Sequence, residues 1–98
     1  MATLPIKFQI IKTLLDGGEH WNYNIVPPIQ KACSMESNYG RDTINFDLLE
    51  LLSAGMIEDL EQQVDEDGVF KKDFLLHKYR ITDFGREWAE AMKLSEED

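Results

Sequence analysis

The chain has 98 residues, 43% hydrophobic and 30% charged, which predicts one globular domain spanning 1–98 and excludes a second core. Its apolar runs are too short to cross a membrane, and the single cysteine, Cys33, excludes an internal disulfide. Nineteen acidic and ten basic residues give a net charge of −9, which disfavours a nucleic-acid binder without excluding one. With no signal-peptide pattern, we expect a cytoplasmic protein in which Cys33 is a small buried apolar residue.

The first third of the chain predicts two helices. The first covers 4–16 and ends at Gly17 and Gly18, and a short connector follows over 19–23. The second covers 24–33, with Asn22 or Asn24 as its cap; since Pro28 lacks a backbone donor, the regular helix is expected to begin nearer Pro27. Apolar residues at helical spacing define the two inward faces: Ile6, Ile10, Ile11, Leu14 and Leu15, then Ile25, Ile29, Ala32 and Cys33.

The stretch 41–59 predicts a third helix that stops abruptly and leads into a strand. A polar turn over 34–40 precedes it, and Asp42 or Gly40 is the expected cap. Gly55 supplies the left-handed residue that ends a helix. The inward stripe has the spacing i, i+4, i+7, i+8: Ile44, Leu48, Leu51 and Leu52.

From Ile57 the apolar period changes from that of a helix to that of a strand. A strand carrying Ile57, Leu60 and Val64 is followed by a turn over 65–68, where Asp-Gly is a strong hairpin signal. The return strand is expected to begin at Phe70 or Phe74 and to end at Ile81. One face of it carries Leu75, His77, Tyr79 and Ile81.

A final helix is expected after the hairpin, capped by Thr82 or Asp83. Residues 95–98 are expected to form a frayed acidic tail. The predicted apolar stripe of this helix is Phe84, Trp88, Ala91 and Met92.

Three stretches together resemble winged helix-turn-helix transcriptional regulators, most closely the PadR-like group and more distantly the MarR-like group. They are the segment 10–25, which resembles a helix end, a turn and a His-Gly-Tyr-Glu-Ile helix start; the segment 43–58, with its Thr-Ile start and Gly-Met-Ile-Glu end; and the segment 78–87, Lys-Tyr-Arg-Ile-Thr-Asp-Phe-Gly-Arg-Glu. The resemblance implies an α+β, mainly α fold, with a three-helix core, a hairpin wing and a C-terminal helix. It also implies a dimeric cytoplasmic regulator that occupies duplex DNA sterically.

In that fold the start of the third helix faces the major groove and the wing reaches the DNA backbone. The residues placed there are Tyr39, Arg41, Thr43, Asn45, Lys71 and Lys72. The ordinary alternative is that they are solvated polar residues. Asp65, Glu66 and Asp67 at the expected wing tip would repel phosphate.

The outer face of the same helix favours a different use. Its centre carries Asp42, Phe46, Leu49 and Ser53, and an acid beside exposed apolar residues is unsuited to DNA. Either the first or last helix of the chain covers Phe46 and Leu49, or these residues with Asp42 form a protein interface, for a second copy or a partner helix. The alternative function is therefore a winged-helix adaptor that binds protein and not DNA.

No enzymatic motif stands out, so we expect no catalysis, no cofactor and no metal. His20 and His77 lie on different elements without ligand spacing and are expected at the surface or at an element's edge. Trp21, Tyr23 and Trp88 are expected to be core aromatics, with a small aromatic-ligand pocket as the less favoured alternative.

Overall fold

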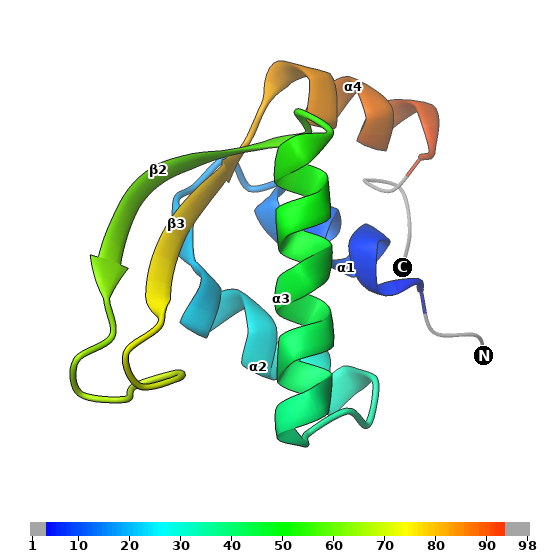
Figure 1. Cartoon of the computed structure of the whole chain (residues 1–98). Helices are drawn as coiled ribbons and strands as arrows, with labels where there is room; N and C mark the ends of the chain where they lie inside the picture. Colours follow the sequence, from blue (N-terminus) through cyan, green and yellow to red (C-terminus); the bar gives the residue numbers. More distant parts are fainter. Residues whose placement is uncertain (1–3, 94–98) are drawn as a thin grey trace.

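The computed structural model describes residues 4–93; the predicted frayed tail at 95–98 lies outside them. The fold is α+β, with helices and a three-stranded antiparallel sheet (Figure 1). Within the described part of the chain, every helix falls short of the length and apolar content needed to cross a membrane. The elements in chain order are α1 (Ile6–Leu14), β1 (His20–Trp21), α2 (Asn22–Ala32), α3 (Asn38–Ser53), β2 (Ile57–Val64), β3 (Leu75–Ile81) and α4 (Asp83–Ala91).

The sheet has the strand order β1-β3-β2, so β3 lies in the middle. Ile57 pairs with Ile81 at one end of the β2–β3 hairpin and Val64 pairs with Leu75 at the other. The register shifts at Leu60, which is an extra residue in β2. Figure 1 shows α3 in front of α1 and α2, with the hairpin on its left and no other element in front of it.

The core lies between α1, α2, α3 and the sheet. Most of the predicted inward positions of α1, α2 and α3 are buried, and Leu52 of the α3 stripe is half-buried. Ala32 is exposed, contrary to its predicted inward position, and Cys33 is half-buried. The core residues are Ile10, Ile11, Leu14, Ile25, Val26, Ile29, Ile44, Leu48, Leu51, Ile57, Tyr79, Ile81 and Ala89.

Helix α2 differs from the prediction at its start. It begins at Asn22, and both Pro27 and Pro28 lie inside it, so the expected start near Pro27 is wrong. Neither Asn22 nor Asn24 caps it, since the N-cap residue is Trp21. The helix extends over the prolines because it buries Ile25 and Val26. The free energy of this packing outweighs the cost of the backbone hydrogen bonds that proline cannot donate.

Helix α3 starts earlier than predicted and ends as expected. Its cap is Ser37, whose hydroxyl accepts a hydrogen bond from the Gly40 N–H at 3.1 Å, so the predicted caps Asp42 and Gly40 are wrong. Gly40 is buried instead, because its backbone packs against the carbonyl of Met35. At the other end Gly55 has φ +80°, the left-handed conformation predicted there.

Helix α4 is capped by Thr82, as predicted, but it faces the core with a different side. Gly85 and Ala89 are buried, whereas Phe84 and Met92 are exposed and Trp88 is half-buried against Phe8. Small residues face inward because the helix passes directly over the Met56 carbonyl, next to Gly85. The predicted stripe of large apolar residues is therefore largely turned to solvent.

Candidate functional site

Helix α3 has an exposed apolar outer face, and its inner face lies in the core. Phe46 is 59% exposed and Leu49 is 38% exposed, so neither α1 nor α4 covers them. Tyr39, near the start of the helix, is 80% exposed. Because Ile44, Leu48 and Leu51 hold the opposite face in the core, the orientation of this outer face is fixed.

The loop between β2 and β3 lies beside this face and is organised by one buried acid, Asp65. Its carboxylate accepts hydrogen bonds from the backbone N–H groups of Val69, Phe70 and Lys71 at 2.7–2.8 Å. Its own backbone N–H donates to the Phe74 carbonyl at 2.8 Å. The predicted tight turn over 65–68 is therefore a longer loop over 65–74, and Asp65 does not present its charge at a wing tip.

Desolvation of the buried Asp65 carboxyl acts to raise its pKa, but the backbone N–H groups that it accepts from outweigh this and hold that pKa below its usual value. The carboxylate is therefore ionised at neutral pH and closes the loop around itself. Because Phe70 lies in this loop, the predicted start of the return strand at Phe70 is wrong, and β3 begins at Leu75, one residue after the alternative start at Phe74.

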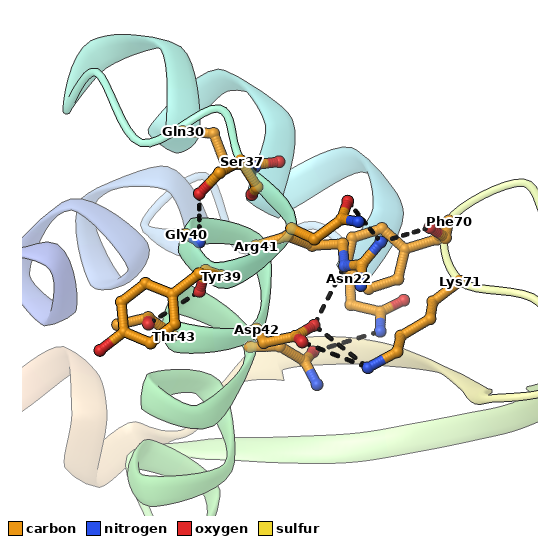
Figure 2. A network of polar contacts seen from close by, with 12 residues as sticks. Asn22, Gln30, Ser37, Tyr39, Gly40, Arg41, Asp42, Thr43, Phe70 and Lys71 are labelled. Carbon is orange, nitrogen blue, oxygen red and sulfur yellow. Dashed lines mark hydrogen bonds and ion pairs between the residues drawn. The ribbon is translucent and has the colours of Figure 1, made fainter.

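The loop brings Lys71 to α3, where Asp42 pairs both with it and with Arg41 of the same helix, two cations predicted to contact DNA (Figure 2). The Arg41 Nε lies 3.0 Å from one Asp42 oxygen, and the Lys71 Nζ lies 3.2 Å from the other. Arg41 also lies over the Phe70 ring at 5.7 Å, and Lys71 lies over the Phe74 ring at 3.9 Å. Hydrogen bonding from Arg41, with a further contribution from Lys71, holds the pKa of Asp42 below its usual value.

The other residues predicted to contact DNA either form hydrogen bonds within the chain or lie outside the Asp42 cluster. The Thr43 hydroxyl donates to the Tyr39 carbonyl at 2.9 Å, one turn back along α3. The Asn45 side chain accepts a hydrogen bond from Asn22 at 3.4 Å. Lys72 is exposed in the 65–74 loop, beside Gly68.

An open groove of about 250 Å³, which we call the α3 groove, lies between α3 and the loop. Phe46 and Leu49 form one wall, and the loop and β3 form the other. Asp42, Asn45 and Lys71 add polar groups. The apolar lining residues are Phe46, Leu49, Phe70, Phe74 and Leu75.

Sequence reasoning missed the second wall of this groove and the buried amide behind it. Phe74 and Leu75 are about half exposed, and Val64 pairs with Leu75 and is exposed as well. Asn22 is fully buried; its amide donates to Asn45 and accepts from the His77 backbone N–H at 3.3 Å. An asparagine at a helix start predicts a cap, so its local context did not reveal this role.

The remaining candidates do not assemble into a second site. Trp21 stacks on Tyr23 at 5.8 Å, but Trp88 lies against Phe8, so the three aromatics do not line one pocket. His20 pairs with Asp16, and His77 pairs with Asp59 at 2.7 Å. No group of three metal-ligating side chains comes together among residues 4–93.

Neither a protein-family model nor a curated protein matches this chain.

Proposed function

We propose that this chain is a non-catalytic winged-helix domain of the cytoplasm that binds protein through the α3 groove. The order of α1, α2, α3 and the β2–β3 hairpin supports the winged-helix interpretation, with the short β1 placed between α1 and α2 and paired with β3. In this interpretation α3 is the third helix of the core and the hairpin is the wing.

One observation carries the proposal: the outer face of α3 is an exposed apolar surface that faces a second apolar wall. A helix that reads base edges needs polar side chains with free hydrogen-bonding groups there. Here Phe46 and Leu49 occupy that position, and Phe74 and Leu75 extend the surface across the groove. Exposed apolar surface of this kind is typical of protein-binding grooves.

The charges at the groove also favour protein. Arg41 and Lys71 are the cations best placed for phosphate, yet both are bonded to Asp42 and lie over aromatic rings. Releasing them to DNA would leave the Asp42 carboxylate facing the phosphates without its partners. With a net charge of −9, the chain also lacks the excess of cations that neutralises phosphates.

A photo-crosslinking residue tests the proposal directly. We expect benzoyl-phenylalanine in place of Phe46 to crosslink to protein in the cells that make this chain, because that side chain lies in the groove. The same residue in place of Phe84, which is 54% exposed on α4, is the matched control and is expected to give far less product. Mass spectrometry identifies the products. Equal yields at both positions, or crosslinks to nucleic acid alone, would contradict protein binding at the groove.

DNA binding is the second candidate, and the convergence of Arg41 and Lys71 beside the exposed Tyr39 favours it. Under this hypothesis a labelled random duplex binds at about 50 mM salt, and the affinity falls steeply as salt increases. Changing either Arg41 or Lys71 to glutamine is expected to reduce the salt slope by about 1. Fluorescence anisotropy measures both effects. If micromolar protein leaves the anisotropy unchanged at low salt, the DNA hypothesis fails.

A further inference from the structure

The outer face of α3, which forms one wall of the α3 groove, differs in charge between its two ends. At the end nearer the start of α3, Arg41 and Lys71 surround Asp42, so two cations meet one anion. Lys71 is only partly buried, and its ammonium lies 3.2 Å from an Asp42 oxygen. The positive end of the helix dipole adds to this charge.

Beyond the other end of the groove, the outer face of α3 has the opposite balance of charge. Phe46 and Leu49 continue there into a shallow surface that includes Glu50, Ser53 and Ala54. Glu50 pairs with Lys7 of α1 at 2.7 Å, and the side chain of Glu50 is nevertheless 44% exposed. Asp47 lies close to both, so two anions meet one cation, and the negative end of the helix dipole lies nearby.

The apolar centre lies halfway between these ends. Asp42 and Glu50 are eight residues apart on α3, about 12 Å along the axis, and Phe46 lies midway between them. If a second α3 packs antiparallel to the first with the two-fold axis beside Phe46, the Lys71 end of one copy meets the Glu50 end of the other. The same contact then occurs twice, as an isologous interface requires.

We infer, on the basis of the proposed protein-binding function, that the occupant of the α3 groove is a second copy of this chain, bound antiparallel through α3. Each copy inserts Phe46 and Leu49 toward the equivalent residues of the other. The Lys71 ammonium has three donors, so it can keep its pair with Asp42 and also pair with Glu50 of the second copy. A face that is positive at one end, apolar in the middle and negative at the other is complementary to itself.

The net charge of −9 does not prevent this contact. Repulsion between exposed charges is screened beyond about 8 Å at physiological ionic strength, whereas the groove contacts are at short range. The acids of β2 are also paired within the chain, Glu58 with Arg80, Asp59 with His77 and Glu61 with Lys78. They lie on the hairpin and not on the outer face of α3.

Sedimentation velocity over a concentration series tests the apolar part of the interface. The unmodified chain is expected to form dimers, and Phe46→Ser is expected to weaken the dimer at least about tenfold because it removes an aromatic ring at the two-fold axis. Phe84→Ser, which changes an exposed ring on α4, is expected to leave the dimer unchanged. A dimer that tolerates Phe46→Ser but not Phe84→Ser would place the interface on α4 and overturn the inference.

Charge exchange tests the antiparallel arrangement. Lys71→Glu alone and Glu50→Lys alone each place like charges together twice in a homodimer, and each is expected to weaken association about tenfold. Mixing the two variants restores two opposite-charge pairs, and so does the double variant. The mixture and the double variant are therefore expected to recover dimer formation. Recovery also controls for folding, because a misfolded variant would not regain its partner.

The outcomes separate this inference from the proposed function. If the chain is monomeric while benzoyl-phenylalanine at position 46 crosslinks a different protein, the second copy is wrong and the protein-binding function stands. If the chain is monomeric and no protein crosslinks, both fail. A dimer that requires Phe46 but shows no recovery in the mixture overturns the antiparallel arrangement.

Discussion

Replacing Gly85 with alanine is expected to lower the free energy of unfolding by about 2 kcal/mol, because the added methyl group has no space. A Cβ at this position would meet the carbonyl oxygen of Met56, which is backbone and cannot move aside as a flexible side chain does. Overpacking of this kind costs roughly 3 kcal/mol, and the better helix propensity of alanine returns about 1 kcal/mol. Chemical denaturation followed by circular dichroism measures the change.

Gly55→Ala is the matched control for this prediction. No atom lies within 4 Å of a Cβ built at Gly55, but its φ of +80° is unfavourable for alanine. We therefore expect a loss of only about 1 kcal/mol there, from backbone strain alone. If Gly85→Ala proves no more destabilising than Gly55→Ala, α4 does not pack on the Met56 carbonyl as described.

Asp65→Asn is expected to loosen the whole 65–74 loop and to lower the thermal midpoint of the domain. Asparagine has the same shape, but its amide NH₂ would replace a carboxylate oxygen that accepts from backbone N–H groups. Hydrogen exchange should accelerate at Val69, Phe70 and Lys71, whose N–H groups are protected by this carboxylate. Asp67→Asn, an exposed acid in the same loop, is the control and is expected to leave those amides unchanged.

The effect of Asp65 also depends on pH in a defined direction. Its folded-state pKa is lowered, so ionised Asp65 stabilises the fold at every pH above its unfolded pKa of about 3.9. This stabilisation is lost as the pH falls from that value through the lower folded pKa. The difference in stability between the unmodified chain and Asp65→Asn should therefore be constant from about pH 5 to 7 and shrink in stronger acid. A difference that grows below pH 4 would mean that the carboxylate is not the stabilising form.

The inner face of α3 was predictable because periodicity alone places Ile44, Leu48 and Leu51 on one side of a helix. Periodicity is misleading for α4. It selected Phe84 and Met92 as the inward face, whereas the helix packs through Gly85 and Ala89. Hydrophobic periodicity favours large apolar side chains as the inward face. It does not detect a contact in which the backbone itself comes close to a neighbour.

Apart from Lys71, the candidate site could be predicted only along α3. Phe46 and Leu49 were identified as an apolar face from their helical positions. Phe74 and Leu75 belong to the opposite wall because Asp65 folds the loop that carries Phe74, and the Asp-Gly signal indicated a shorter turn. Lys71 and Asp42 are 29 residues apart, so no local pattern predicted that the acid would hold the cation.

The buried Asn22 side chain covers part of one edge of the sheet, next to β1. β1 is only two residues long, and beyond it the Asn22 side-chain oxygen accepts from the His77 N–H in place of a neighbouring strand. That edge of β3 is thus occupied by an amide from a helix, and β2 provides the other edge of the sheet. β2 carries three acids and an extra residue at Leu60, both of which discourage the addition of a foreign strand. Growth into fibres by edge-to-edge pairing is therefore opposed at β2 and at the part of β3 that lies beyond β1.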